Sequence, residues 1–373
     1  MSGIWGRNLE ISIFGESHGR AIGVTIHGLA PGIKLDLESI QGELERRAPG
    51  GSEFSSPRQE SDDFEILSGY FKGRTTGGPL TALLWNRDTR SRDYENLRTK
   101  LRPGHGDYSG HVKYRGFQDF RGGGHFSGRL TAPLVFAGAI AKQLLESRSI
   151  LVGAHIKSIM DIKDDDFDPL EIPGESIRRL RDMDFPVLNG HQGRRMQERI
   201  RQAREEQDSV GGIVQCAITN LPPGIGDPFF HSLESSLAQM MFSIPGVKGI
   251  EFGSGFNISR LRGSQVKDEY ALEDGRIVTL ANHNGGILGG ISTGMPILFN
   301  TAIKPTSSIG QEQRTVDINR MEETTLTIEG RHDPCILPRA VPVIEAGAAL
   351  VILDLIMEGE GKDGWAGSVE DGD

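Results

Sequence analysis

The chain of 373 residues is long enough for one large domain or two ordinary ones, and its 36% hydrophobic and 25% charged residues are typical of a globular protein in water. A formal net charge of −10 disfavours nucleic acid or an anionic membrane as the main partner. The low share of aromatic residues, 6%, also disfavours a surface on which the bases of single-stranded nucleic acid would stack. The 2 cysteines indicate a reducing compartment and the N-terminus has no signal pattern, so we expect a cytoplasmic protein.

Hydrophobic periodicity predicts strands and helices along the chain. We expect strands at residues 9–14, 23–27, 64–69, 80–85 and 213–219. We expect helices at residues 37–47, 127–147, 192–207, 230–242 and 340–357. The apolar helix at 127–147 should lie at the centre of the fold. The one at 340–357 contains Pro342, Glu345 and Asp354, which favours a buried helix over a membrane span.

Two stretches differ in composition from the rest of the chain. Residues 161–190 are polar and contain proline, which predicts an insertion or a flexible connection. Residues 359–373 are acidic and rich in glycine, which predicts a disordered tail. The order of strands and helices recurs loosely in the second half, so an internal pseudo-duplication stays open, although no matching residues establish it.

Glycine-rich segments that also carry histidine, arginine or lysine recur along the chain. They are GESHG (15–19), RPGHGD (102–107), GGGHFS (122–127), NHNGG (282–286), KPTSS (304–308) and GRHDPC (330–335). Glycine lets backbone N–H groups approach a ligand, cations neutralise an anion, and histidine moves a proton near neutral pH. Gathered in one place, these segments would form a site for a phosphorylated ligand that undergoes proton transfer.

Each segment taken alone also has a structural explanation. His18 and His105 adjoin glycines and are candidate proton carriers, but a lone histidine is more often a structural hydrogen-bonding residue. The glycines before the 127–147 helix predict a phosphate cradle at a helix N-terminus, or merely a tight turn. Arg46 and Arg47 clamp a substrate or simply complement a helix dipole. A divalent-metal site stays open on the histidines and aspartates, but no familiar ligand spacing is present, and we predict no metal.

The segments together resemble one family. GESHG, RRAPGG, RPGHGDYSG, RGGGHFSGR, LRGSQVKDE, NHNGGILGGISTG, IKPTSSI and GRHDPCILPRAVPVIEA occur in the order and approximate spacing of chorismate synthases, from about residue 6 to residue 354. The resemblance implies an α+β fold, a layered sandwich of long helices between antiparallel β-sheets, as a single domain over residues 1–358. It also implies a homotetramer.

The resemblance further implies a lyase of the shikimate pathway. The substrate would be 5-enolpyruvylshikimate 3-phosphate, which loses phosphate in an anti-1,4-elimination that yields chorismate. The cofactor would be reduced FMN, with NADPH as a reductant of the flavin in some members. Two rival interpretations stay open: a metal-dependent phosphohydrolase, and a non-catalytic flavin- or phosphate-binding relative.

The motifs shared with the family imply roles for individual residues of this chain. His18 would protonate the departing phosphate, His105 would lie by the flavin, and Asp333 would assist proton removal. Residues implied to bind the substrate's anionic groups are Arg46, Arg47, Arg102, Arg129 and Arg331. Residues implied to contact FMN are His125, Phe126, Ser127, Pro245, Gly246, Gly289, Lys304, Pro305, Thr306, Ser307, Ser308 and Arg331. Arg47 also falls at a position linked to NADP.

Some positions depart from the family pattern. His125 and Phe126 stand where many relatives have arginine and serine, and Pro245 and Gly246 stand where an Asn-Ala pair is usual. Glu53 replaces an arginine, which weakens the case for NADP. These changes affect the expected contacts with cofactors more than they affect the residues expected to move protons.

Overall fold

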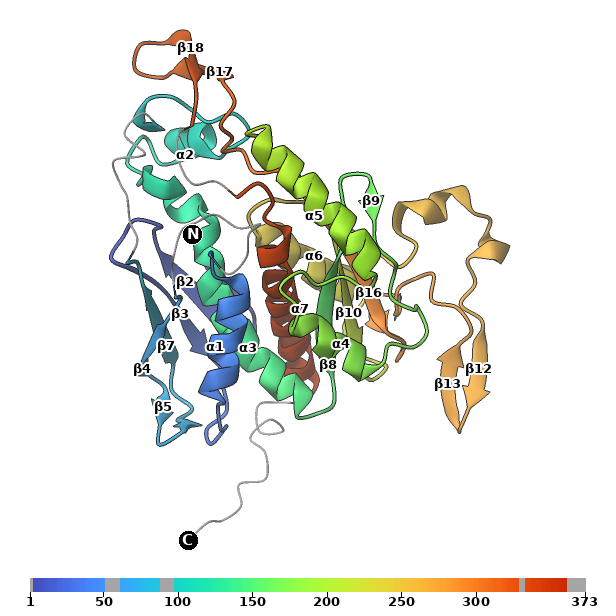
Figure 1. The fold of residues 1–373 in the computed structure, drawn as a ribbon. Coiled ribbons are helices and arrows are strands. Elements are labelled where there is room, and N and C mark those ends of the chain that lie inside the picture. The colour runs from blue at the N-terminus through green and yellow to red at the C-terminus, as the bar shows by residue number, and fades with distance from the viewer. Residues whose placement is uncertain (1–2, 51–60, 88–96, 329–332, 361–373) are drawn as a thin grey trace.

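Two antiparallel sheets enclose a layer of helices in the computed structural model, which describes residues 3–50, 61–87, 97–328 and 333–360 (Figure 1). The first sheet has the order β1 (Ile4–Trp5), β2 (Glu10–Gly15), β3 (Ala21–His27), β7 (Leu80–Trp85) and β4 (Phe64–Ser68). The second has the order β11 (Val247–Phe252), β16 (Ile297–Ile303), β10 (Gly212–Thr219), β8 (Leu151–Ile159) and β9 (Ile162–Lys163). This arrangement confirms the predicted α+β sandwich.

The α-helices are α1 (Leu37–Arg47), α2 (Asp107–Lys113), α3 (Thr131–Glu146), α4 (Gly174–Arg181), α5 (Gly190–Glu205), α6 (Leu233–Ser243) and α7 (Leu337–Glu360). Short 3₁₀ turns are η2 (Arg121–Phe126), η3 (Gly128–Leu130), η4 (Phe229–His231), η5 (Gly255–Arg260) and η6 (Gly263–Gln265). Small hairpins pair β5 (Tyr70–Phe71) with β6 (Arg74–Thr75), β12 (Tyr270–Glu273) with β13 (Arg276–Thr279), β14 (Ile287–Leu288) with β15 (Ile291–Ser292), and β17 (Gln313–Asp317) with β18 (Glu322–Leu326).

The predicted helices and strands agree with these bounds except at their ends. Residues 37–47 and 80–85 match α1 and β7 to the residue. The helix predicted at 127–147 differs: Ser127 caps the short turn η3, and the continuous helix α3 begins only at Thr131. The first sheet, at residues 4–85, is followed by α3, and the second sheet, at residues 151–303, is followed by α7, but the strand orders differ, so a pseudo-duplication stays open.

Helices α3 and α7 pack against each other at the centre of the molecule (Figure 1). Their backbones approach closely at Gly138, where a Cβ atom would lie only 2.3 Å from the Cβ of Ala346. By length and composition the stretch Leu337–Gly359 could cross a membrane, but 94% of its apolar window is buried within the fold. Helix α7 is therefore packed as the core helix that the sequence predicts. It extends to Glu360, and residues 361–373 of the predicted tail lie outside the described residues.

Residues 161–190 begin with β9, the edge strand of the second sheet, and continue over the outer face of that sheet. Ile177 of α4 packs in an apolar cluster with Leu151 of β8. Buried His155 places Nδ1 2.9 Å from the Oδ2 atom of Asp164, which also accepts backbone hydrogen bonds at the end of the stretch. The stretch is thus packed against the sheet, and its polar composition reflects its exposed face. That it is an insertion stays a prediction.

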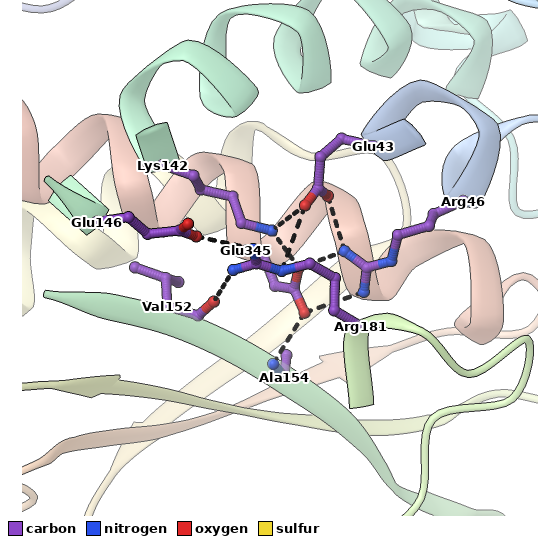
Figure 2. A network of polar contacts seen from close by, with 8 residues as sticks. All are labelled: Glu43, Arg46, Lys142, Glu146, Val152, Ala154, Arg181 and Glu345. Carbon is purple, nitrogen blue, oxygen red and sulfur yellow. Dashed lines mark hydrogen bonds and ion pairs between the residues drawn. The ribbon is translucent and has the colours of Figure 1, made fainter. Parts of the chain in front are cut away.

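A buried ion cluster joins the helices to the second sheet (Figure 2). The carboxylate of Glu345 in α7 accepts hydrogen bonds from Arg46 of α1 at 2.7 Å, Lys142 of α3 at 2.8 Å and the amide of Ala154 in β8 at 3.0 Å. Glu43 accepts from the same two cationic side chains at 2.7 and 2.6 Å. Burial alone would raise the pKa of Glu345, but Arg46 and Lys142 outweigh it and hold the pKa well below its usual range.

Replacing Gly138 with alanine tests the contact between α3 and α7. The added methyl group would overlap Ala346, so we expect the free energy of unfolding to fall by about 1–3 kcal/mol. Gly42 of α1 is the matched control, because no atom lies within 4 Å of a Cβ built there. Gly42→Ala should raise stability by about 0.5–1 kcal/mol through helix propensity. Urea unfolding of both variants measures the difference, and equal stabilities would contradict the packing described.

Candidate functional site

The triple-glycine segment lies between the two candidate histidines. Gly122, Gly123 and Gly124 all have positive φ angles, of 60°, 84° and 55°. A Cβ atom on Gly122 would lie 2.1 Å from Nδ1 of His18, and one on Gly123 would lie 3.4 Å from Nε2 of His105. Gly122 therefore has no room for a side chain beside His18, whereas Gly123 is favoured next to His105 by its positive φ angle.

This segment does not cap the long helix as the sequence predicted. Its left-handed backbone forms η2, and η3 intervenes before α3 begins at Thr131. The amide of Ser17 instead donates to the carbonyl oxygen of Gly124 at 3.1 Å, which fastens the turn after β2 to the glycines. Ser17 is fully buried, and its Oγ has no hydrogen-bond partner among the described residues.

His105 belongs to an ion-paired triad. Arg102 donates from Nε and Nη2 to both oxygens of Asp107, at 2.8 and 2.7 Å, and His105 Nδ1 lies 2.6 Å from Oδ1 of the same carboxylate. Burial would raise the pKa of Asp107, but the hydrogen bonds from Arg102 and His105 outweigh it and hold the pKa well below its usual range. The ionised carboxylate of Asp107 accepts a hydrogen bond from Nδ1–H of His105, so Nε2, on the Gly123 side, is the ring nitrogen that can accept a proton.

The Lys304–Ser308 segment, from the other half of the chain, contacts the loop that carries this triad. Ser307 Oγ donates to the carbonyl oxygen of Gly104 at 2.8 Å, and Lys304 Nζ makes a close contact with the same oxygen. Thr306 Oγ1 donates to the carbonyl oxygen of Asp333 at 3.1 Å. The Lys304 amide donates to Gly246 at 2.9 Å, which places the end of α6 beside the segment.

Asp333 is joined in turn to the end of α1. Its Oδ2 atom lies 2.6 Å from Nη1 of Arg339, whose Nε donates to the backbone oxygen of Arg47 at 3.0 Å. Arg47 is only 3% exposed, and each of its three guanidinium nitrogens donates to a protein oxygen. One of these acceptors is Asp62, at 2.7 Å.

Asp62 links Arg47 to Arg129 and so connects these contacts back to His18. Its other oxygen makes a close ion pair with Arg129, whose Nε donates to Asn86 at 3.1 Å. Asn86 Nδ2 donates to the carbonyl oxygens of Glu16 and Gly19, at 3.1 and 2.9 Å, on either side of His18. We call this closed chain of contacts the polar ring. Its members are His18, Gly122, Gly123, His105, Arg102, Asp107, Gly104, Lys304, Ser307, Thr306, Asp333, Arg339, Arg47, Asp62, Arg129 and Asn86.

The charge of the polar ring is positive when its histidines are neutral. Its cations are Arg47, Arg102, Arg129, Lys304 and Arg339, and its carboxylates are Asp62, Asp107 and Asp333, so the cations outnumber the carboxylates. Helices α3 and α7 both begin at the ring, at Thr131 and Leu337, and their positive dipole ends add to this field. The ring is therefore suited to an anionic ligand.

Several residues expected at the site lie elsewhere. Arg46 turns away from Arg47 into the buried ion cluster, where it binds Glu345 and Glu43 (Figure 2). This placement separates Arg46 from the other arginines assigned to the substrate. Gly289 lies in the hairpin at the start of α6, whereas Pro245 and Gly246 follow its end, about 16 Å away along the helix. Arg331 lies outside the described residues.

The residues after the triple glycine lie at the edge of the ring. His125 is exposed and its Nδ1 lies 3.0 Å from the carbonyl oxygen of Gly15. The Phe126 ring packs on Gly110 of α2 and near Tyr114, 6.1 Å between centroids. The Ser127 side chain accepts from the amide of Arg129 and so caps η3.

Sequence reasoning missed Asp62, Asn86 and Arg339. Asn86 directly follows the strand predicted at 80–85, and a polar side chain at a strand end was an available signal. Arg339 lies within the segment that follows Asp333 and could have been selected from it. Asp62 had no signal, because its neighbour Asp63 is equally acidic and the pairing depends on arginines far away in the sequence.

Comparisons with known proteins show the family and the fold of the chain. The family described as chorismate synthase matches residues 9–357. A chorismate synthase of Thermococcus kodakarensis is 46% identical over 364 residues, which are 98% of this chain and 99% of the relative. One of Methanothermobacter thermautotrophicus is 44% identical over 354 residues, 94% of this chain and 92% of the relative. A crystal structure of chorismate synthase superposes with a TM-score of 0.76 at 28% identity, covering 96% of this chain and 94% of the other.

Replacing Asp107 with asparagine tests the triad through its pH dependence. The variant should lose about 2–4 kcal/mol of unfolding free energy at pH 7, because Arg102 stays buried without its counter-ion. A carboxyl whose pKa is lowered by folding stabilises fully above its unfolded pKa, about 3.9, and loses that contribution as the pH falls toward the folded value.

The stability difference between wild type and Asp107→Asn should therefore narrow as the pH falls below about 4. Urea unfolding between pH 7 and pH 3 measures it. Exposed Asp161, paired with Arg199 at 3.3 Å, is the control, and Asp161→Asn should cost less than about 1 kcal/mol throughout. A difference for Asp107→Asn that does not change with pH would contradict the triad.

Proposed function

The chain belongs to the chorismate synthase family, the carbon–oxygen lyases that form chorismate in the shikimate pathway, and we propose that the polar ring is its active site. The proposed substrate is 5-enolpyruvylshikimate 3-phosphate, which loses phosphate by an anti-1,4-elimination. The observation that carries this proposal is the position of His18 and His105 on either side of one glycine backbone. Two proton carriers so placed can act on one small ligand.

The charge of the ring supports an anionic substrate. A phosphate and carboxylates would neutralise the excess of cations over carboxylates, and a site with little water strengthens these interactions. We propose Arg102, Arg129 and Arg331 as cations that bind or orient these groups. Arg46 and Arg47 act behind them, because Arg46 binds Glu345 and Glu43 in the ion cluster and all three guanidinium nitrogens of Arg47 donate to protein oxygens.

The proton transfers fall to three residues. His18 donates a proton to the phosphate oxygen as the C–O bond breaks. His105 transfers its proton through Nε2, because Nδ1 is hydrogen-bonded to Asp107. Asp333 assists removal of the C6 proton, and its carboxylate is held in place by Arg339. Proton transfer by positioned groups contributes roughly 10²–10⁴-fold to the rate of such reactions.

The residues present fit reduced FMN as the cofactor. The glycine backbone admits a close approach, the buried Ser17 Oγ lacks a partner among the described residues, and Lys304 supplies a cation suited to a phosphate. We propose that FMN is held by His125, Phe126, Ser127, Pro245, Gly246, Lys304, Pro305, Thr306, Ser307, Ser308 and Arg331, and not by Gly289, which lies at the opposite end of α6. Reduced flavin supplies transient electron density that helps to expel phosphate. NADPH as its reductant is a separate proposal, which buried Arg47 does not favour.

The two rival functions differ from this proposal in testable ways. A metal-dependent phosphohydrolase would need Asp107 as a ligand, but both of its oxygens accept from Arg102. Its activity would be lost with a chelator. A non-catalytic relative would bind FMN without turnover, and the retained triad around His105 argues against it.

We propose a cytoplasmic homotetramer. The β12–β13 hairpin projects from the body of the molecule (Figure 1). Tyr270, Leu272 and Ile277 on it are 67%, 78% and 70% exposed. Leu272 and Ile277 are paired across the hairpin, so they present one apolar face, which is typical of an interface.

Anaerobic turnover tests the proposed reaction. With photoreduced FMN and 5-enolpyruvylshikimate 3-phosphate, the wild-type protein should form chorismate, followed by its absorbance, and oxidised FMN should support none. His18→Ala and His105→Ala should each lower kcat by about 10²-fold or more, because each removes a proton carrier. His191, exposed on α5, is the control, and His191→Ala should retain full activity. Losses below about tenfold, or 1.4 kcal/mol, in both variants would remove the proton-transfer assignment.

Light scattering tests the proposed assembly. The double variant Leu272→Lys, Ile277→Lys should lower the molar mass in solution from that of a tetramer, because it places charges on the apolar face of the hairpin. Glu273→Lys changes an exposed polar residue of the same hairpin and should leave the tetramer intact. A tetramer that persists in the double variant would show that other surfaces hold the subunits together.

A further inference from the structure

Asp62 is a buried carboxylate shared by two arginines. Its side chain is 0% exposed, with Oδ2 2.7 Å from Nη1 of Arg47 and Oδ1 in close contact with Nη1 of Arg129. Its backbone has a φ angle of 51°, a left-handed conformation that aspartate tolerates better than most residues but that still carries strain. The fold thus holds Asp62 against a backbone preference in order to place this carboxylate.

The two arginines connect Asp62 to separate parts of the polar ring. Arg47 also donates to Thr131 Oγ1 at 3.1 Å and to the carbonyl oxygen of Gly128 at 3.1 Å, at the start of α3. Arg129 also donates to Asn86, which bonds to the turn around His18. One carboxylate therefore sets the position of the end of α1 relative to the turn that carries the candidate proton donor.

The surroundings of Asp62 contain more positive than negative charge. Burial lowers the pKa of Arg47 to about 10, a shift that Asp62 opposes and that nearby Arg339 and Arg129 increase. Burial would raise the pKa of Asp62, but Arg47 and Arg129 outweigh it and hold the pKa below its usual range. Without this carboxylate, two buried guanidinium groups would face each other and repel, and Arg129 would move.

We propose that Asp62 is a positioning residue that holds Arg47 and Arg129 in place before the anionic substrate binds. This inference rests on the proposed function, since the ligand is the phosphorylated substrate of the same ring. Preorganised cations bind an anion without the free-energy cost of arranging them during binding. Asp62 touches no reacting atom, so its loss should weaken binding more than it slows the chemical step.

The test compares Asp62→Ala with Asp63→Ala. Asp63 is the adjacent carboxylate, but it is 53% exposed and pairs with the exposed Arg87. Asp62→Ala should raise KM for 5-enolpyruvylshikimate 3-phosphate about 30-fold or more. It should change kcat by less than about fivefold, and Asp63→Ala should change neither constant. Titration calorimetry with oxidised FMN, which supports no turnover, should show the same loss of substrate affinity.

Formate distinguishes a missing charge from a general loss of structure. Alanine leaves a space the size of the deleted carboxylate, so sodium formate should restore KM in Asp62→Ala, whereas sodium chloride at equal ionic strength should not. Asp62→Asn keeps the shape of the side chain and provides a folded alternative if the alanine variant is unstable. It should show the same rise in KM without rescue, because the amide fills the space.

The outcomes separate this inference from the proposed function. No chorismate from the wild-type protein would overturn the proposed function itself. Normal wild-type turnover with an unchanged KM in Asp62→Ala would overturn only the positioning role. A lower KM in that variant would also overturn it, because it would mean that the Asp62 carboxylate competes with the substrate for the arginines.

Discussion

The carboxylate of Glu345 is the interaction on which the arrangement of the layers depends. It is 1% exposed and binds α1, α3 and β8 at once from the central helix α7 (Figure 2). Removing one member of such a cluster leaves a buried charge without a partner and costs about 3–5 kcal/mol, a large part of the 5–15 kcal/mol that holds a typical domain folded. The apolar contacts between α3 and α7 favour association of the helices, whereas Glu345 specifies which positions face each other.

The same carboxylate orients the candidate site through a single helix end. Arg46 enters the ion cluster, and Arg47, the next residue of α1, points about 100° away around the helix axis to Asp62. The adjacent arginines therefore have different roles, one in the helical layer and one in the polar ring. Because Asp62 also binds Arg129, the position of α1 is transmitted to the turn that carries His18.

Backbone conformation and charge make separate contributions to the ring. Gly122 provides space, because a side chain there would displace the imidazole ring of His18, and the positive φ angle of Gly123 favours glycine at the position next to His105. The arginines and Lys304 provide positive charge in excess of the carboxylates that orient them. A histidine such as His105 then has one nitrogen held by Asp107 and the other directed at the glycine backbone, which is the arrangement that moving a proton requires.

Most of the secondary structure could be predicted from the sequence, because helical and strand periodicity are local properties. Residues 37–47 and 80–85 were predicted to the residue, and the glycine-rich motifs identified the family and its candidate proton carriers. The break before α3 was not predicted, since it follows three left-handed glycines, of which Gly122 and Gly123 lie against His18 and His105.

The partners of the charged side chains were decided by the tertiary structure alone. Nothing local distinguishes Arg46 from Arg47, or Asp62 from Asp63, because in each pair the residues are adjacent and chemically alike. Burial and distant counter-charges separate them: Glu345 binds the first arginine, and Arg129 shares Asp62 with the second. The sequence by itself thus determined which chemical groups the site contains, and the packing of the helices determined which of them meet.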